Sequence, residues 1–303
     1  MAKIILAGGS GFIGQILAAH FIGKGDEVVV LTRGGNRVVN NVRYVNWNAE
    51  TIGNWVAELE NCDVLINLNG KSVNCRYNNK NKKEILDSRV NATRILGEAI
   101  RMVGTPPKLW INAASATIYR HAEDRPQDEY TGELGKGFSV DVCKQWEAAF
   151  FEQDTPGVRK IGLRIAITLG SNGGVMPYYF NLAKFGLGGR QGNGKQYFSW
   201  IHEHDLTGII DFLIDYKELE GIFNVSSPNP VQNHQFMRVV RNVMRTPFGL
   251  PATKWMLAIG TRLLGTEAEL VLKSRWVVPT KLQEAGYIFK VTYINDAVKL
   301  SSL

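Results

Sequence analysis

The feature that most constrains the fold is a glycine-rich turn near the start of the chain. Residues 7–14 read Ala-Gly-Gly-Ser-Gly-Phe-Ile-Gly, and they separate an apolar run at 4–7 from a segment at 12–22 with helical spacing. Such a turn lets a pyrophosphate approach the main chain, where helix N–H groups and the helix dipole meet it. A glycine pattern alone is weak evidence, but here the strand–turn–helix context agrees with it. We therefore expect a dinucleotide-binding turn rather than a merely structural one.

Strand-like and helix-like segments alternate from the start of the chain, which predicts a parallel sheet with crossover helices. The continuous Val and Leu run at 27–31 is typical of a strand that is covered on both faces. The expected fold class is α/β, a Rossmann-type doubly wound parallel sheet with a smaller C-terminal α+β lobe. The expected strands are 4–7, 27–31, 42–45, 64–68, 109–113, 160–164 and 221–225, and the expected helices are 12–22, 80–102, 139–152 and 205–216.

Beyond residue 165 the organisation changes, because segments rich in glycine and proline separate shorter elements. The dinucleotide-binding domain is expected to cover 1–165 and to be joined again by about 203–226. The remaining segments, 166–202 and 227–303, would form the smaller lobe, which is the expected place for a substrate.

The charge balance narrows the range of partners. The formal net charge is +7, but the 35 Lys and Arg residues are spread along the chain. Nucleic-acid binding would require a basic face with stacking aromatic residues, and the sequence shows no such grouping. A modest positive excess suits an anionic small ligand equally well. We expect an unidentified small-molecule substrate, no nucleic acid and no membrane.

Cysteine usage and the apolar segments predict a cytoplasmic protein. Cys62, Cys75 and Cys143 form neither a CxxC motif nor a Cys/His metal spacing, so no metal site is expected. Residues 1–7 run into an apolar strand without a basic leader. The apolar stretch at 255–264 is too short to span a bilayer.

The second expected strand ends in Leu31-Thr32-Arg33, without the Asp or Glu that would bond the ribose 2′-hydroxyl of NAD. Arg33 could instead pair with a 2′-phosphate through its planar charged fork. The alternative is a solvated surface arginine. We expect NADP(H) as the cofactor.

Several further motifs point to one family. They read Leu-Ile-Asn-Leu-Asn-Gly at 65–70, Ser-Arg-Val-Asn-Ala-Thr at 88–93, Ser-Ala-Thr-Ile-Tyr at 115–119 and Trp-Ile-His at 200–202. With the glycine-rich turn, they make the whole chain resemble the extended short-chain dehydrogenase/reductase family, the relatives of nucleotide-sugar epimerases. It is most similar to the epimerase-like branch sometimes labelled as cell-division-inhibitor proteins. A homodimer formed through two helices is frequent in this family and is therefore an expected assembly.

The resemblance implies a set of cofactor contacts. The end of the fourth strand would lie beside the ribose and diphosphate, Asn48 would lie near the adenine, and Lys144 would bind the nicotinamide ribose. The expected cofactor-binding residues are Gly8, Ser10, Gly11, Phe12, Ile13, Gly14, Arg33, Asn48, Leu68, Asn69, Gly70, Ala113 and Lys144.

The resemblance also implies a catalytic set, with one departure. Ser115 matches the residue that hydrogen-bonds a substrate oxygen. The family's tyrosine stands four residues before the lysine, where this chain has Val140. Valine cannot transfer a proton, so the usual acid–base mechanism cannot run from that position. The similar branch also tends to lack this tyrosine. The expected catalytic residues are Ser115, Lys144 and Tyr119.

The missing proton donor leaves alternatives open. Tyr119 could stand near the nicotinamide, although we favour the alternative that its ring only packs against other side chains. We expect His202 to be structural, Asp205 to cap the helix that follows, and Cys143 to be a buried small residue. The alternative for Lys144 is that it is an ordinary surface lysine without a role in binding. Two functions remain: an NADP(H)-dependent oxidoreductase or epimerase-like enzyme, and a non-catalytic NADP(H) sensor or scaffold.

Overall fold

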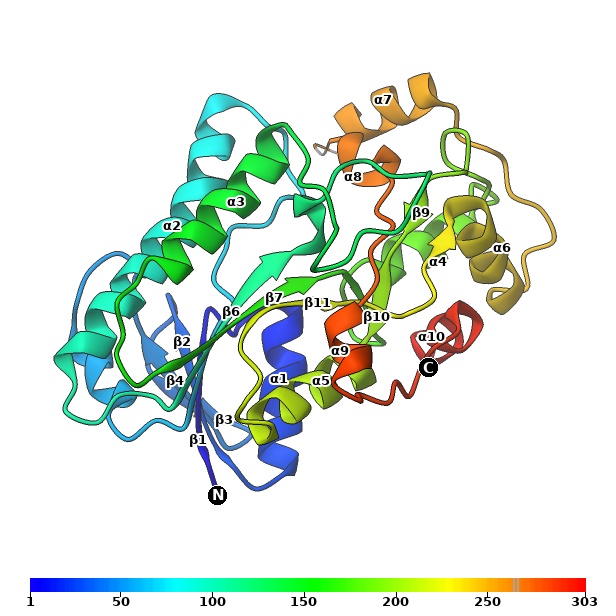
Figure 1. Ribbon diagram of the computed structural model, residues 1–303. Coiled ribbons are helices and arrows are strands. Elements are labelled where there is room, and N and C mark those ends of the chain that lie inside the picture. The colour runs from blue at the N-terminus through cyan, green and yellow to red at the C-terminus, as the bar shows by residue number, and fades with distance from the viewer. Residues whose placement is uncertain (264, 266) are drawn as a thin grey trace.

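A mostly parallel sheet runs through the centre of the larger part of the molecule (Figure 1). The computed structural model describes residues 1–263, 265 and 267–303. Within this part of the chain, the sheet contains β1 (Lys3–Ala7), β2 (Glu27–Thr32), β3 (Arg37–Val39), β4 (Val42–Asn46), β5 (Val64–Asn67), β6 (Leu109–Ser115), β7 (Arg159–Ile165) and β11 (Gly221–Val225). The spatial order is β11-β7-β6-β5-β1-β2-β4-β3, and every neighbouring pair is parallel except β3 with β4. The doubly wound α/β prediction is confirmed.

Helices cover both faces of this sheet. They are α1 (Phe12–Gly23), α2 (Asn79–Met102), α3 (Phe138–Phe151) and α5 (Glu203–Asp215), with the short 3-10 helices η1 (Asn54–Leu59) and η2 (Ala116–Ile118). In β1, Ile4 and Leu6 belong to a core with residues of α1 and α5, whereas Ile5 and Ala7 belong to a second core with α2 and η1. Because successive side chains of a strand point to opposite faces, one continuous apolar run serves both cores.

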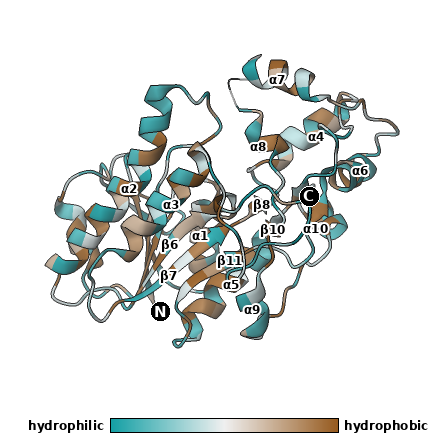
Figure 2. Ribbon diagram, turned by 45° about the horizontal axis from the view of Figure 1, so that its top comes forward, coloured by the Kyte–Doolittle hydropathy of each residue, from teal (hydrophilic) through white to brown (hydrophobic). Residues whose placement is uncertain are grey.

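Apart from α5 and β11, which belong to the sheet and its covering layer, most of the chain after β7 builds a smaller lobe beside the end of the sheet (Figure 1). Its elements are β8 (Ile167–Leu169), α4 (Met176–Lys184), β9 (Tyr197–Phe198), β10 (Trp200–His202), β12 (Val231–Gln232), α6 (Asn233–Val243), α7 (Lys254–Leu263), α8 (Glu269–Leu272) and α10 (Ile294–Leu300). The short helix α9 (Thr280–Glu284) instead packs against β11, and its Leu282 belongs to the core of the main sheet. The core of the smaller lobe joins α4, α6 and α10 through buried residues such as Met176, Phe236 and Val298. Figure 2 shows hydrophobic residues also on α7, at the outer end of the lobe, where Trp255 and Ile259 are more than half exposed.

The sequence interpretation missed the β3–β4 hairpin at the edge of the sheet. Asn40 and Asn41 join the two strands with φ of +50° and +62°. Two consecutive residues with positive φ are what a type I′ hairpin turn requires, and asparagine tolerates that conformation well. The Asn-Asn pair between valines was therefore an available signal.

The predicted cap of the helix at 205–216 was wrong. Helix α5 begins at Glu203, and its N-cap is His202, whose Nδ1 accepts the N–H of His204 at 3.2 Å. Asp205 is fully buried inside the first turn and accepts the N–H groups of Lys290 and Val291 at 2.7 and 2.8 Å. Its carboxylate therefore holds a distant segment of the chain instead of capping its own helix.

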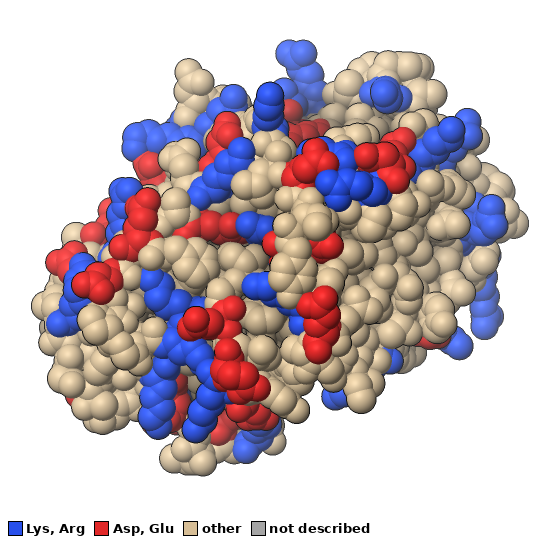
Figure 3. All heavy atoms as spheres, in the orientation of Figure 1, with Lys and Arg blue, Asp and Glu red and all other residues tan. Residues whose placement is uncertain are grey.

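Charges of both signs are mixed on the face shown in Figure 3, where Lys and Arg lie among Asp and Glu. The described surface also contains direct ion pairs, including Arg120 with Asp124 and Lys108 with Asp63.

Cys62, Cys75 and Cys143 are free thiols. Among the described helices, none combines the length and apolar character that crossing a bilayer needs.

Candidate cofactor and active site

The glycine-rich turn joins β1 to α1, and its glycines are needed for different reasons. Gly8 has a φ of +74°, and a Cβ there would lie 2.7 Å from the Cα of Asn69. A Cβ on Gly14 would lie 2.3 Å from the carbonyl oxygen of Gly9, so only glycine lets α1 approach the turn this closely. At Gly11 a Cβ would meet no described atom within 4 Å. The turn is therefore crowded on two sides and open at Gly11.

The open side of the turn fits a diphosphate. Gly11 is the N-cap of α1 and has no side chain with which to bond the first-turn N–H groups. Free N–H groups and the positive end of the helix dipole favour an anion at this position. Ser10 is exposed and Ile13 half-buried beside it, while Phe12 contacts the loop after β8, where a Cβ on Gly174 would lie 2.7 Å from its ring. The turn thus also touches the smaller lobe.

The loop after β2 presents the arginine that we expect to select the cofactor. Arg33 is exposed, and its side chain forms no hydrogen bond or ion pair with any described residue. The surrounding main chain is fixed by Asn46, whose Nδ2 donates to the carbonyl oxygens of Arg33 at 3.3 Å and Gly34 at 2.9 Å. The Oδ1 of Asn36 in turn accepts the Asn46 N–H at 2.7 Å. The loop is therefore held through its backbone while the Arg33 guanidinium is left free.

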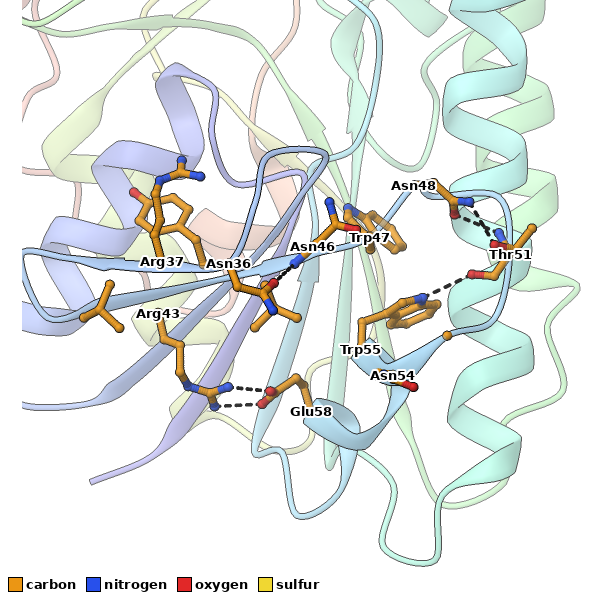
Figure 4. A pocket seen from close by; sticks show the side chains of 14 residues that line it. Asn36, Arg37, Arg43, Asn46, Trp47, Asn48, Thr51, Asn54, Trp55 and Glu58 are labelled. Atoms are coloured by element: carbon orange, nitrogen blue, oxygen red, sulfur yellow. Dashed lines mark hydrogen bonds and ion pairs between the residues drawn. The ribbon is translucent and has the colours of Figure 1, made fainter.

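A groove of about 710 Å³ lies next to this loop, between the β3–β4 hairpin and η1 (Figure 4). Arg37 lies on one side of it, stacked over the ring of Tyr44 with 4.2 Å between the guanidinium carbon and the ring centre. Trp55 and Asn48 line the other side, and Asn48 forms a turn by accepting the N–H of Thr51 at 3.0 Å. The glycine-rich turn does not line this groove. The expected contact between Asn48 and an adenine ring stays a prediction.

The end of β5 lies directly against the glycine-rich turn. Leu68 donates its N–H to the carbonyl oxygen of Ala7 at 2.8 Å, and the main chain of Asn69 packs against Gly8. A Cβ on Gly70 would lie 2.9 Å from the guanidinium carbon of Arg89. The structure thus brings residues 68–70 together with the turn, as expected for two strands that flank a switch in strand order.

Ser115 and Lys144 lie on the neighbouring elements. Ser115 ends β6 after the buried Ala113, and its Oγ accepts the N–H of Thr117 at 3.2 Å. Because that bond uses a lone pair of the hydroxyl, the hydroxyl proton stays available for donation. Lys144 on α3 donates from Nζ to the carbonyl oxygen of Gly135 at 3.0 Å. Its contact with a cofactor ribose stays a prediction.

Val140 is fully buried, in a cluster with Ala116 and Ile118. One residue earlier on α3, Ser139 donates to the carboxylate of Glu269 at 3.3 Å.

One turn beyond Val140, Cys143 lies within electrostatic reach of three cationic side chains, and burial raises the pKa of its thiol to about 11. These cations are Arg89, Lys273 and Arg275. The sequence interpretation missed all three, although Arg89 lies inside the motif at 88–93.

The hydroxyl of Tyr119 lies inside a buried hydrogen-bond network. Its side chain is 1% exposed, its hydroxyl donates to Oδ1 of Asn224 at 3.0 Å, and it accepts from Arg164 at 2.8 Å. Arg164 also forms a two-bond ion pair with Glu147, with both nitrogen–oxygen distances at 2.8 Å. Burial raises the pKa of Tyr119. This geometry favours the packing alternative, because a proton donor here would first have to leave a buried network.

Comparisons with known proteins identify the family. The family model for the NAD dependent epimerase/dehydratase family matches residues 4–226. The chain belongs to this family. The resemblance inferred from the motifs is therefore confirmed. Residues 252–300 of this epimerase-family protein match a second model, a domain of unknown function, DUF1731.

Individual relatives match along the whole chain. Epimerase family protein YfhF of Bacillus subtilis is 32% identical over 306 residues, which cover 99% of this chain and 97% of the relative. The crystal structure of human epimerase family protein SDR39U1 (isoform 2) with NADPH matches with a TM-score of 0.88 and 26% identity over 99% of both chains. The nucleoside-diphosphate sugar epimerase from Corynebacterium glutamicum matches with a TM-score of 0.79 and 27% identity, over 99% of this chain and 58% of that one.

Proposed function

We propose that this epimerase-family protein is an NADP(H)-dependent oxidoreductase or epimerase-like enzyme that acts on a small carbonyl compound or a nucleotide-sugar-like substrate. The observation that carries the proposal is the open helix N-terminus at Gly11, next to a loop that presents the free guanidinium of Arg33. No carboxylate stands at the end of β2 to favour NAD. The similarity to human SDR39U1, whose structure contains NADPH, supports the same cofactor.

Each part of the cofactor has a candidate partner among the described residues. The first-turn N–H groups of α1 would bind the diphosphate, Arg33 would bind the 2′-phosphate, and Lys144 would bind the nicotinamide ribose. Bound NADP(H) would supply or accept a hydride at its nicotinamide ring.

Ser115 is the residue best placed to polarise a substrate carbonyl. Its oxygen is fixed by the N–H of Thr117, so the hydroxyl proton can point toward a substrate oxygen. Val140 has no proton to deliver, and the hydroxyl proton of the buried Tyr119 is donated to Asn224. Proton delivery would therefore come from water, from the substrate or from a side chain outside the family's usual set.

A non-catalytic NADP(H) sensor or scaffold is the second candidate, and the apolar Val140 at the tyrosine position favours it. In this function, cofactor binding would set the shape of the smaller lobe for a protein partner. Phe12 provides a direct contact between the cofactor turn and that lobe.

The first experiment compares the binding of NADPH and NADH by quenching of tryptophan fluorescence. We predict that Arg33→Ala weakens NADPH binding by about 10-fold or more, because it removes charge-assisted hydrogen bonds to the 2′-phosphate. NADH binding should be unchanged. Arg94→Ala removes an exposed arginine on α2 and should bind both cofactors as the wild type does. Equal affinity of the wild type for NADPH and NADH would contradict the cofactor assignment.

A second measurement separates the two functions. NADPH absorbance should change with at least one member of a panel of carbonyl compounds and nucleotide sugars if the protein is an enzyme. Tight NADPH binding without turnover, together with a different oligomeric state or partner in NADP+ than in NADPH, would favour the sensor.

A further inference from the structure

Three cationic side chains lie within electrostatic reach of the buried Cys143, and none of them has a carboxylate partner among the described residues; two of them, Lys273 and Arg275, also act on each other. Arg89 comes from α2, and Lys273 and Arg275 follow α8. Arg275 is only 9% exposed. Buried charges are normally paired, because an unpaired one loses its hydration without compensation. Among the described residues, no carboxylate therefore compensates these cations for the hydration that burial removes.

The electrostatic surroundings agree with a missing anion. Burial lowers the pKa of Arg89 and Arg275, and burial together with the charge of Arg275 lowers that of Lys273 to about 8. Glu269 acts on Lys273 and Arg275 at longer range only, and its carboxylate already accepts a hydrogen bond from α3. An anion between these groups would offset their desolvation.

The cluster borders the residue that would polarise the substrate. Lys273 donates from Nζ to the carbonyl oxygen of Thr117 at 2.7 Å, and Arg275 donates from Nε to its Oγ1 at 3.1 Å. The N–H of the same Thr117 binds the Oγ of Ser115. One residue thus separates Ser115 from the two cations. Lys273 retains two N–H donors, and Nη2 of Arg275 forms no hydrogen bond with a described residue.

A second polar group in the same place lacks a partner. The hydroxyl of Tyr77 is buried and lies near Ser139, but no described atom forms a well-directed hydrogen bond with it. Arg89 and Arg275 both lie within electrostatic reach of this hydroxyl. A donor held next to unpaired cations is what an acceptor-rich anion requires.

We propose that the substrate carries an anionic group, a carboxylate or a phosphate, that binds to Lys273 and Arg275 beside Thr117, with Arg89 and the Tyr77 hydroxyl completing the site. This inference rests on the proposed function, since it names the substrate class of the same site. Because only Thr117 separates the cations from Ser115, the charged group lies close to the reacting carbonyl. The substrate class is a compact oxo acid or its phosphate counterpart.

The test uses two small anions, oxalate and inorganic phosphate, titrated by calorimetry into the purified protein with and without saturating NADPH. Lys273→Met and Arg275→Gln should each weaken binding of the preferred anion by about 10-fold or more. Lys217→Met removes an exposed charge after α5 and should bind as the wild type does. Preference for oxalate or for phosphate identifies which anionic group the substrate carries.

Lys273→Met keeps the test decisive if the buried Arg275 is needed for folding, because Lys273 is only half-buried. Unaltered anion binding in this variant would overturn the inference, and so would a wild type that binds neither anion in either condition. The cofactor proposal is tested separately by the NADPH titration. Lys273-dependent anion binding without any NADPH binding would leave the anion site standing and remove the cofactor assignment.

Discussion

His202 is a buried histidine whose two ring nitrogens have different surroundings. Nδ1 accepts the N–H of His204 and so caps α5, whereas Nε2 has no hydrogen-bond partner among the described residues. The residue is 1% exposed, and burial, with a smaller contribution from His204, lowers its pKa to about 4. The ring is therefore neutral near pH 7, which agrees with the structural role expected for it.

We predict that His202 makes folding sensitive to acid. The unfolded chain binds a proton at this side chain near pH 6.5, but the folded chain binds it only near pH 4. The free energy of unfolding therefore falls as the pH decreases from about 6.5 to about 4, by about 3 kcal/mol from this residue. His202→Asn keeps an acceptor for the cap and removes the titratable ring. Urea unfolding between pH 6.5 and pH 4 measures the effect. The free energy of unfolding of His202→Asn should fall less over this range than that of the wild type.

The matched control is His121→Asn, because His121 is exposed. This variant should keep the acid dependence of the wild type. An identical pH dependence in His202→Asn and the wild type would show that the buried ring does not control the acid response.

The β3–β4 hairpin holds the loop after β2 in place. Asn46, the last residue of β4, donates to two carbonyl oxygens of the loop after β2, while Asn36 accepts its N–H. None of these contacts uses the side chain of Arg33. If Arg33 binds the cofactor as we propose, Asn46 is a positioning residue that acts through the loop that it holds.

We predict that Asn46→Ala weakens NADPH binding by about 3- to 10-fold, because the loop that presents Arg33 loses two hydrogen bonds. NADH binding should change less. If Asn46 acts through Arg33, adding Asn46→Ala to Arg33→Ala should cause no further loss, and fluorescence titration of the four proteins measures this coupling. Asn295→Ala, an exposed substitution on α10 away from the loop and its groove, is the control. Additive losses in the double variant would contradict a positioning role.

The regular elements of the larger domain were predictable because each rests on a local pattern. The buried strands are continuous apolar runs, and α1 follows a turn whose glycines mark its start. The edge hairpin was harder to predict, since Arg37, Val38 and Val39 are all exposed and show no buried face. Its only local signal is the Asn-Asn turn that follows.

At the scale of the whole molecule, one buried carboxylate connects segments that the sequence keeps far apart. Asp205 of α5 accepts the N–H groups of Lys290 and Val291 and the hydroxyl of Tyr287. This segment leads into α10, which completes the core of the smaller lobe. No local pattern reveals partners more than 80 residues away, so the sequence predicted a helix cap instead. The same reason hid the cluster of Arg89, Lys273 and Arg275.

We predict that Asp205→Ala lowers the free energy of unfolding by about 3 kcal/mol or more, because two buried N–H groups lose their acceptor. Chemical denaturation measures the loss, and limited proteolysis should cut the segment after α9 earlier than in the wild type. Asp296→Ala on α10 removes an exposed carboxylate and should change stability by less than about 0.5 kcal/mol. If Asp205→Ala were as stable as the wild type, the hydrogen bonds from Asp205 to Lys290 and Val291 would not stabilise the fold.

The backbone attachment of the loop after β2 also bears on how such a protein changes during evolution. Asn46 holds the main chain at Arg33 and Gly34, Asn36 accepts the N–H of Asn46, and the side chain at position 33 takes no part in these bonds. A mutation at position 33 would therefore leave this attachment in place, and if Arg33 selects the cofactor as we propose, a single codon change there would alter coenzyme preference while the scaffold stays intact. In that case coenzyme preference would change readily between lineages that share this hairpin, whereas the crowded glycines of the turn would be kept.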